Sequence, residues 1–431
     1  MAAVTSGASP YRPRVLDREL DELLPALPAI ALDGAKGVGK TETARQRART
    51  VHALDEPGAV EIAGADPVRL LAGEPPVLID EWQRYPQSWD LVRRSVDEDR
   101  SGGRFLLTGS ATPRDPGTHS GAGRIVRLRM RPMTLSERGI GSPTVSLRAL
   151  LGGDRGSVGG SSDARLEQYV DELCASGFPG LRGVGGRALG AQLDGYLDRM
   201  IDRDFPDAGR TIRNPAGLRR WLTAYAAATS TTTTFDAIRD AATPGDTGKA
   251  AKTTTSFFRD TLERLWILDP LPAWLPTRHH LRRLGHGSKH HLADPALAVR
   301  LLGVDQGALL DSPAAGSPRA RDATLLGQLF ESLVTLDVRV YAQAAEAKVG
   351  HLRTQGGEHE IDLIVQRRDH SVVALEVKLS QTVGSSDVRH LLWLRDRMGE
   401  DLLDAAVITT GSEAYRRQDG IAVIPAALLG P

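Results

Sequence analysis

The fold of this chain is decided by one stretch, Gly34-Ala35-Lys36-Gly37-Val38-Gly39-Lys40-Thr41. It matches the pattern G-x-x-x-x-G-K-[ST] at every specified position, and this pattern is typical of loops that hold nucleotide phosphates. Its glycines lack a Cβ, so the backbone can curl tightly and point its N–H groups inward. We expect Lys40 to reach the β- and γ-phosphates and Thr41 to bind Mg²⁺.

The residues on either side of this loop favour an α/β fold. The apolar run Ala29-Ile30-Ala31-Leu32 predicts a buried strand before the loop, and the polar segment from Thr41 to Ala53 predicts a helix after it. The N-terminus of that helix is expected to face the phosphates. Further along, Ala59-Val60-Glu61-Ile62 predicts a second strand and Asp66 to Ala72 a short helix.

Two carboxylates follow the next predicted strand. The run Pro76-Val77-Leu78-Ile79-Asp80-Glu81 is apolar until its last two residues. A second nucleotide motif needs acidic groups at the carboxyl edge of a parallel strand. Asp80 is therefore predicted to hold Mg²⁺, directly or through water, and Glu81 to polarise the attacking water.

Two later segments supply further candidate groups. The apolar run from Phe105 to Ser110 predicts a strand whose tip carries Thr108 and Ser110, candidate sensors of the γ-phosphate. Arg124 follows a Gly-rich loop and is a candidate arginine finger. The alternating basic residues after it, Arg127, Arg129 and Arg131, instead face solvent, phosphate or an acidic partner.

Length and composition limit the classes of function. A chain of 431 residues can form two or three domains. The single cysteine excludes an internal disulfide and a Cys-rich zinc site. We expect a cytoplasmic protein, because no apolar stretch is long enough for a bilayer and the N-terminus lacks a signal-peptide core. The formal charge is zero, so nucleic acid would have to bind at local basic surfaces.

This series of motifs resembles prokaryotic AAA-type ATPases of the AAA_14 class, which are commonly fused to a DUF4143 region. The resemblance rests on the phosphate loop and on four later segments, Leu78–Pro86, Leu106–Ser110, Gly123-Arg124 and Arg131–Glu137. It implies ATP and Mg²⁺ as ligands and an ATPase core that ends near Ile140. Two later landmarks of the family recur as Ser176–Gly180 and Tyr196–Asp204.

The middle of the chain is predicted to be helical. Gly152 to Asp163 is a flexible linker by composition, and apolar residues recur at helical spacing from Ala164 to Ala228. From Phe235 to Leu265 the pattern outlines a winged helix-turn-helix, whose last helix would present Lys252, Ser256 and Arg259 to DNA. The alternative is a module that packs as a lid or joint.

A basic, histidine-rich segment runs from Arg278 to His291. It holds five of the eleven histidines together with four Arg or Lys residues. Adjacent histidines point apart and no carboxylate or cysteine lies between them, which disfavours zinc. We interpret the segment as a basic loop that is solvated or contacts phosphate.

The second informative group of residues is C-terminal. Glu376 and Lys378 lie two apart in a predicted strand and therefore share a face, and a hairpin would bring Asp362 beside them. Two carboxylates can hold Mg²⁺ or Mn²⁺, and a neighbouring lysine can orient water for attack on a phosphodiester. The arrangement resembles the PD-(D/E)xK nuclease fold, in which a helical glutamate, matched here by Glu331, often joins the site. The alternative is a salt-bridged pair on an exposed face.

The sequence thus predicts three parts. They are a P-loop ATPase with a parallel sheet at 1–150, a helical and winged-helix domain at 151–300, and an α/β restriction-nuclease-like domain at 301–431. The leading hypothesis is an ATPase coupled to DNA binding or to metal-dependent DNA cleavage. Its rivals are an ATP-controlled switch or partner-binding protein with a non-catalytic scaffold, and a winged-helix transcriptional regulator. A homo-oligomer or a protein partner is compatible with each.

Overall fold

The computed structural model describes nine ranges of the chain: 11–110, 122–156, 158–207, 212, 214–243, 251–274, 287–311, 324–354 and 356–431. The chain forms two compact units. The first consists of Met1–Asp33, Gly39–Gly109 and Gly117–Arg129, and the second of Gly34–Val38, Ser110–Pro116 and Met130–Pro431.

The first unit is built on a five-stranded parallel sheet, which confirms the predicted N-terminal fold class. In spatial order its strands are β2 (Thr50–Ala53), β3 (Val77–Asp80), β4 (Phe105–Gly109), β1 (Ala29–Asp33) and β5 (Ile125–Arg129). Every neighbouring pair is parallel. The carboxyl ends of all five strands therefore lie at one edge of the sheet, which is where open α/β sheets bind ligands.

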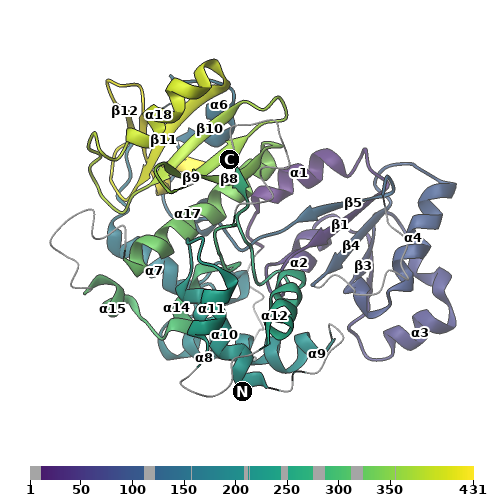
Figure 1. Ribbon diagram of the computed structural model, residues 1–431. Coiled ribbons are helices and arrows are strands. Elements are labelled where there is room, and N and C mark those ends of the chain that lie inside the picture. The colour runs from purple at the N-terminus through teal and green to yellow at the C-terminus, as the bar shows by residue number, and fades with distance from the viewer. Residues whose placement is uncertain are drawn as a thin grey trace, which may run out of the picture. The chain divides into compact units, whose positions relative to one another are not determined.

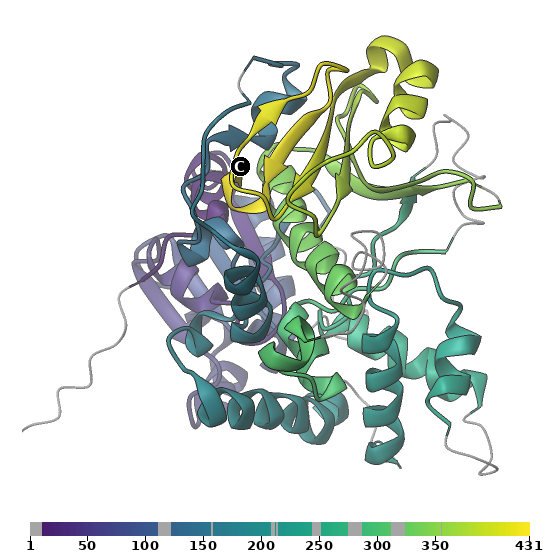
Figure 2. The ribbon, with the colours of Figure 1, turned by 90° about the vertical axis from the view of Figure 1, so that its left-hand side faces the viewer.

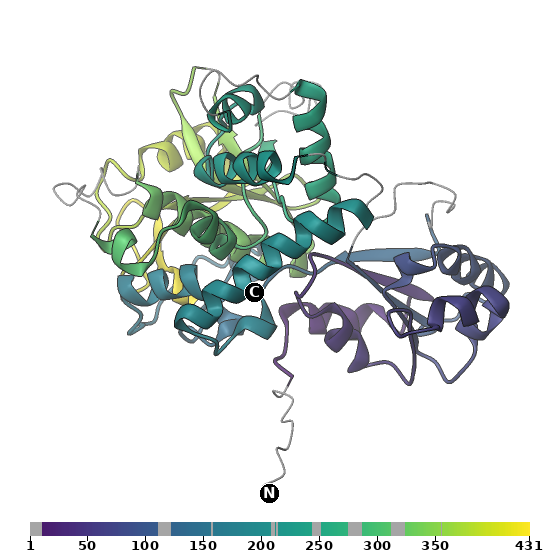
Figure 3. The ribbon, with the colours of Figure 1, turned by 90° about the horizontal axis from the view of Figure 1, so that it is seen from below.

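Helices cover both faces of this sheet (Figures 1 and 3). Along β1, Ala29 and Ala31 belong to a core cluster with α3 (Ala59–Ala65), the short 3₁₀ helix η1 (Pro67–Leu71) and α4 (Gln87–Glu98). The intervening Ile30 and Leu32 are also buried and point to the other face. Two further helices belong to this unit, α1 (Val15–Leu23) and α2 (Lys40–Arg45), and α2 packs on β1, β3 and β4.

Two local predictions in this unit are wrong. The helix after the phosphate loop ends at Arg45, and Thr50–Ala53 forms strand β2. The segment predicted as the second strand is helix α3. β2 lies at the edge of the sheet and is only partly buried. Its sequence therefore lacks the apolar run that predicts a buried strand. In α3 only Ala63 is buried and Ile62 is 52% exposed, which a central strand would not allow.

The part of the second unit that follows Met130 begins with a largely helical region, which starts before residue 151, where the sequence placed the helical domain. Its helices are α5 (Leu135–Arg138), α6 (Leu147–Leu151), α7 (Leu166–Ala175), η3 (Pro179–Leu181), α8 (Gly186–Arg199), η4 (Met200–Asp204), α9 (Phe205–Asp207), α10 (Pro215–Ala227), α11 (Phe235–Ala241), α12 (Lys252–Arg264), α14 (Pro295–Leu302) and α15 (Gln306–Leu310). α11 and α12 match the two flanking helices of the predicted winged helix. The segment between them lies mostly outside the described residues.

A mixed seven-stranded sheet forms the C-terminal part of this unit. In spatial order the strands are β12 (Tyr415–Arg416), β13 (Ala422–Pro425), β11 (Leu402–Thr409), β10 (Val372–Val377), β9 (Glu360–Gln366), β8 (Lys348–Arg353) and β7 (Ala273–Trp274). α18 (Arg389–Met398, followed by η5, Gly399–Asp401) packs on the face that carries Ile364, Ala374 and Val407. The long helix α17 (Leu325–Ala344), drawn in green in Figure 2, contacts β8, β9 and β10.

Segments from the middle of the sequence complete this C-terminal sheet. β7 pairs with β8, although it lies before the predicted boundary at 300. The short strand β6 (Val145–Ser146) pairs with β14 (Leu429–Gly430), which follows η6 (Ala426–Leu428). The predicted linker also contacts the C-terminal part of the chain, because the Ser162 N–H donates a hydrogen bond of 2.7 Å to the Ser412 carbonyl. Of the helices that the structure describes, none has the length and apolarity needed to span a membrane.

Candidate functional site

The phosphate loop adopts a backbone that only glycine tolerates easily. Gly37 and Gly39 have φ of 83° and 101°, in the left-handed region that favours glycine. A Cβ on Gly34 would lie 2.1 Å from the Met130 carbonyl oxygen, so the chain can pass there only without a side chain. The loop follows β1 directly at the carboxyl edge of the sheet. Ala35, Lys36 and Val38 fill its remaining positions.

The predicted magnesium ligands meet at this edge. Thr41 Oγ1 donates a hydrogen bond of 2.8 Å to Asp80 Oδ1. Thr108 Oγ1 donates to the same oxygen, so three side chains from three elements converge on one point. All three supply oxygen atoms, the ligands that Mg²⁺ prefers. The residues present therefore fit the predicted magnesium site, in which Thr41 and Asp80 would hold the ion.

The predicted catalytic carboxylate directly follows Asp80. Glu81 has φ of 54°, an uncommon conformation for a residue with a side chain. Its Oε2 atom accepts a hydrogen bond of 2.5 Å from Gln83 Nε2. We infer that Gln83, a residue to which the sequence assigned no role, orients this carboxylate. Ser110, the other predicted sensor, lies one residue beyond the end of β4.

The predicted arginine finger lies at the wrong edge of the sheet for its own phosphate loop. The parallel register pairs Ala29 with Ile125 and Asp33 with Arg129. Arg124 precedes Ile125, so about five residues, or roughly 16 Å of strand, separate it from the edge that carries the loop. Its guanidinium forms an ion pair with Asp97 at 2.8 Å. Within its own chain, Arg124 therefore lies away from the carboxyl edge of the sheet.

Arg127, one of the residues predicted to face solvent, phosphate or an acidic partner, pairs with an acidic residue beside the loop. Arg127 Nε donates to Asp33 Oδ2 at 2.5 Å, and Asp33 is the residue directly before Gly34. Burial raises the pKa of Asp33, although the Arg127 guanidinium opposes this shift. The register of β1 and β5, which the alternating sequence alone does not give, brings the two together.

The four C-terminal candidates lie in one pocket of the second unit. Its volume is about 210 Å³, and its lining includes Glu331, Glu360, Asp362, Glu376 and Lys378. β9 and β10 form the predicted hairpin, in which Leu375 pairs with Leu363. Asp362 Oδ2 accepts a hydrogen bond of 2.9 Å from the Val377 N–H. The Lys378 ammonium lies 3.1 Å from Glu376 Oε1, as expected for residues on one face.

A lysine from the histidine-rich segment also enters this cluster. Lys289 Nζ lies 2.8 Å from Glu331 Oε1, 2.8 Å from Asp362 Oδ1 and 3.3 Å from Glu360 Oε1. Only 1% of Lys289 is exposed, and His290 and His291 beside it are buried as well. The interpretation of this segment as a solvated basic loop is therefore wrong for these three residues. Residues 278–286 of the segment lie outside the described ranges.

The charges in the cluster perturb one another. Burial and the Asp362 carboxylate raise the pKa of Glu331 to about 8, and burial and Asp362 do the same to the pKa of Glu376. Burial also works to raise the pKa of Asp362, but the ammonium groups of Lys289 and Lys378 outweigh it and hold that pKa below its usual range. In the part of the chain that the structure describes, no group of three or more His, Cys, Asp or Glu residues is placed to hold a metal.

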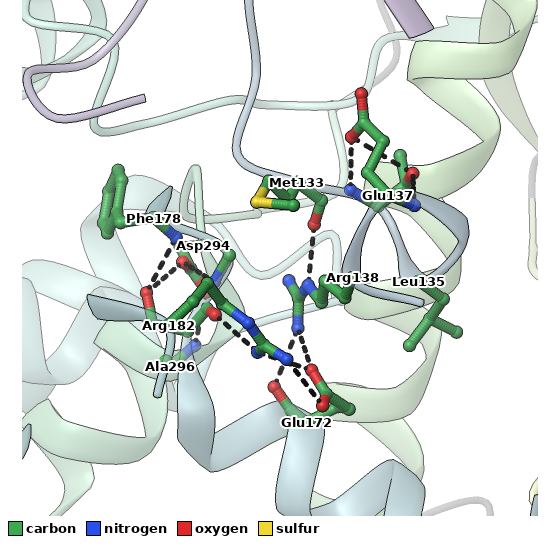
Figure 4. Close-up of polar contacts among 12 residues, drawn as sticks. Met133, Leu135, Glu137, Arg138, Glu172, Phe178, Arg182, Asp294 and Ala296 are labelled. Atoms are coloured by element: carbon green, nitrogen blue, oxygen red, sulfur yellow. Dashed lines mark hydrogen bonds and ion pairs between the residues drawn. The ribbon is translucent and has the colours of Figure 1, made fainter. Parts of the chain in front are cut away.

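A buried ionic network lies next to the segment Arg131–Glu137 (Figure 4). Arg138 donates to the Met133 carbonyl at 2.8 Å and pairs with Glu172 at 3.2 Å, and Arg182 binds both oxygens of Glu172. The Ser176 hydroxyl and the Gly177 N–H each donate to Asp294 Oδ2 at 2.7 Å. The Ser176–Gly180 landmark therefore joins α7 to α14.

A buried carboxylate beside this network predicts a pH dependence of stability. Asp337 accepts hydrogen bonds from the Leu135 N–H at 3.2 and 3.3 Å, and burial raises its pKa to about 8. The folded state thus keeps a proton that the unfolded state loses above about pH 4. Asp337 stabilises the fold fully below that pH, and its contribution falls as the pH rises to about 8, by at most about 1.4 kcal/mol per pH unit. Replacing Asp337 with Asn is expected to flatten this part of the stability profile, measured by urea unfolding from pH 4 to pH 9. An unchanged slope in the variant would contradict the assignment.

The predicted DNA-reading helix has its basic groups engaged. Lys252 forms an ion pair with Asp236 at 2.9 Å, and Arg259 pairs with Asp260 at 2.8 Å. The guanidinium of Arg259 also lies over the Phe235 ring, 5.0 Å from its centroid. Phe258 and Leu262 face inward, as predicted. These acidic partners reduce the positive charge that α12 can offer to a phosphate backbone.

Comparison with known proteins identifies three regions. Residues 27–138 match the family model of an AAA domain (AAA_14), and residues 326–429 match a domain of unknown function, DUF4143. Residues 166–308 match a second domain of unknown function, DUF8612. One chain therefore carries a match to an AAA domain and a match to a DUF4143 domain. The AAA match and the geometry of the phosphate loop support an ATP-binding ATPase.

Relatives extend over most of the chain. The uncharacterized proteins Mb2031c of Mycobacterium bovis and Rv2008c of Mycobacterium tuberculosis are each 26% identical to it over 408 residues. The alignment covers 93% of this chain and 80% of each relative. Among solved structures, the Walker-type ATPase of Pyrococcus abyssi is 16% identical, with a TM-score of 0.39 over 66% of this chain and 94% of that one.

Proposed function

We propose that this chain is a magnesium-dependent ATPase whose chemistry takes place at the carboxyl edge of the N-terminal sheet. The observation that carries the proposal is the hydrogen bond of 2.8 Å between Thr41 and Asp80, joined by Thr108. These groups lie 39 and 28 positions apart in the sequence and meet at the end of the phosphate loop. An enzyme that binds a magnesium nucleotide needs this convergence.

Each residue has a distinct role in the proposal. Lys40 and the loop backbone from Gly34 to Gly39 bind the phosphates, and Thr41 and Asp80 hold Mg²⁺, which neutralises charge on the phosphate oxygens when bound. Glu81, oriented by Gln83, accepts a proton from the attacking water. Thr108 and Ser110 contact the γ-phosphate side of the site.

The direct test is the release of γ-phosphate from ATP by the purified chain. We expect release that requires Mg²⁺ and that falls sharply in the Lys40→Ala variant. Equal rates in the wild type and the variant, or no release by the wild type with Mg²⁺ present, would refute the proposal.

Arg124 and Arg127 lie on one strand segment and provide a matched pair of variants. In dilute protein, Arg124→Ala is expected to leave ATP hydrolysis within about twofold of the wild-type rate, because its exposed ion pair with Asp97 contributes little. Arg127→Ala leaves Asp33, which is 4% exposed, without its ion-pair partner directly before the phosphate loop. We expect this variant to hydrolyse ATP at least tenfold more slowly.

The protein concentration distinguishes the two sources of an arginine finger. If the rate per chain rises with concentration and Arg124→Ala removes that rise, Arg124 acts on a neighbouring copy. A loss of activity in Arg124→Ala at all concentrations would contradict the register of β1 and β5.

Coupling to DNA stays a prediction of the sequence, and the ion pairs of Lys252 and Arg259 do not favour it. Metal-dependent cleavage is not part of the proposal, because the carboxylates that would bind the metal hold Lys289. This observation favours the rival in which the C-terminal domain is a scaffold without nuclease chemistry.

A further inference from the structure

The C-terminal carboxylates surround a positively charged side chain of the same protein, the ammonium group of Lys289. A lysine ammonium has three N–H donors and no acceptor. The Nζ atom of Lys289 faces three carboxylates, those of Glu331, Asp362 and Glu360, at 2.8, 2.8 and 3.3 Å. Its three donors are thus matched by three acceptors, and the place between Glu331 and Asp362 is filled.

The fold holds Lys289 in this position. Its N–H donates to the Leu271 carbonyl and its carbonyl accepts from the Leu271 N–H, both at 2.9 Å. The next two residues are also held by hydrogen bonds, His290 to the Thr233 carbonyl and His291 to the Ser332 hydroxyl. The side chain is 1% exposed, so it has no route to solvent without movement of this segment.

The electrostatics keep Lys289 charged. Burial works to lower the pKa of Lys289, but the carboxylates of Asp362, Glu331 and Glu360 outweigh it and hold that pKa well above its usual value. A protonated lysine cannot coordinate a metal, and its positive charge repels one at this distance. The donor set that the sequence predicts for Mg²⁺ or Mn²⁺ therefore does not fit a metal in this structure.

The pocket carries acidic and basic side chains together. Four acidic side chains line it, Glu331, Glu360, Asp362 and Glu376, and the ammonium groups of the buried Lys289 and the lining Lys378 contact members of this set. A metal ion normally offsets the repulsion between such carboxylates and a phosphate. Here the buried Lys289 ammonium group contacts Glu331, Asp362 and Glu360, where such a metal would lie.

We propose that Lys289 is the resident cation of the C-terminal site and takes the place of a divalent metal. The nuclease-like arrangement then has a structural role. Its ion pairs with Lys289 hold the segment 287–294 against α17 and β9. Lys289 lies in the region that matches DUF8612, whereas Glu331 and Asp362 lie in the region that matches DUF4143. These ion pairs thus join two regions that match separate family models. This inference does not depend on ATP hydrolysis.

The test is a titration of the nucleotide-free full chain with Mn²⁺, with free Mn²⁺ measured by electron paramagnetic resonance. We expect Lys289→Ala to bind Mn²⁺ at one additional site, at least tenfold more tightly than the wild type does there, because three carboxylates then face an empty place. The second substitution in Lys289→Ala/Asp362→Asn should remove that site. The matched control is Lys348→Ala, an exposed lysine at the start of β8. The Thr41–Asp80 site is common to all variants and cancels in the comparison.

Thermal unfolding supplies a second readout. Lys289→Ala should melt at a lower temperature than the wild type, and Mn²⁺ should restore part of the loss in this variant but not in the wild type. If Lys289→Ala does not fold, the wild type and Glu376→Gln are compared directly, and equal Mn²⁺ titrations support the proposal. Tight Mn²⁺ binding by the wild type that Glu376→Gln weakens, or Mn²⁺-dependent DNA cleavage that Asp362→Asn abolishes, would overturn it.

Discussion

Replacement of Lys40 by alanine is expected to lower the rate of ATP hydrolysis by about 10²- to 10³-fold, the cost of removing one preorganised charge from a transition state. Lys40 is 5% exposed and begins α2 directly after Gly39. The transferred phosphoryl group spreads negative charge over its oxygens, and a fixed ammonium stabilises that charge more in the transition state than in the ground state. The measurement is γ-phosphate release at saturating ATP and Mg²⁺.

A matched variant separates this effect from damage to the helix. Arg45 lies at the other end of α2, is exposed, and pairs with Glu42 at 3.7 Å. Arg45→Ala should hydrolyse ATP at nearly the wild-type rate, since an exposed pair of this kind contributes about 0–1 kcal/mol. Equal losses in Lys40→Ala and Arg45→Ala would mean that the helix, and not the ammonium group, is responsible.

Replacement of Gly177 by alanine is expected to destabilise the second unit by about 1–3 kcal/mol, the usual effect of forcing an extra group into a packed interior. A Cβ at this position would lie 2.5 Å from Arg138 Nη2 and 2.9 Å from the Met133 carbonyl oxygen. Arg138 cannot move aside freely, because its guanidinium is bound to Met133 and to Glu172. The new methyl group therefore disrupts the network in Figure 4.

Gly180 provides the control three residues away. A Cβ on Gly180 would meet nothing within 4 Å, so alanine fits there without a clash. We expect Gly180→Ala to change the free energy of unfolding by less than about 1 kcal/mol, with a small gain from the reduced freedom of the unfolded chain. Urea unfolding of both variants, followed by circular dichroism, tests the pair. Similar midpoints for Gly177→Ala and Gly180→Ala would show that Arg138 and Met133 can move to make room for the added methyl group.

The sequence predicts groups well where a fixed spacing ties chemistry to local structure. Thr41 and Asp80 were predicted as joint ligands because each closes its own motif, and the parallel sheet brings the ends of both motifs to one edge. The hairpin of Asp362 and Glu376 was predicted for a similar reason, since alternation along two consecutive strands fixes which residues share a face.

Long-range partners leave no such periodic signal. Lys289 comes from an irregular segment 42 and 73 positions before the carboxylates that it binds, and its basic neighbours suggested a surface loop. Arg124 was predicted as a finger from its place after a Gly-rich loop, but only the strand register shows which edge of the sheet it occupies. In both cases the missing information is the tertiary pairing.

The pairing of β6 with β14 has a consequence for synthesis on the ribosome. The Ser146 hydroxyl donates to the Pro431 carbonyl across 285 positions, so the second unit cannot finish folding until residues 429–431 have emerged. The described residues of the first unit end at Arg129, and this unit can form while later residues are still being translated. During that interval, residues 145 and 146 lack their strand partner. Their unpaired backbone groups can then be bound by a chaperone or by a second nascent chain.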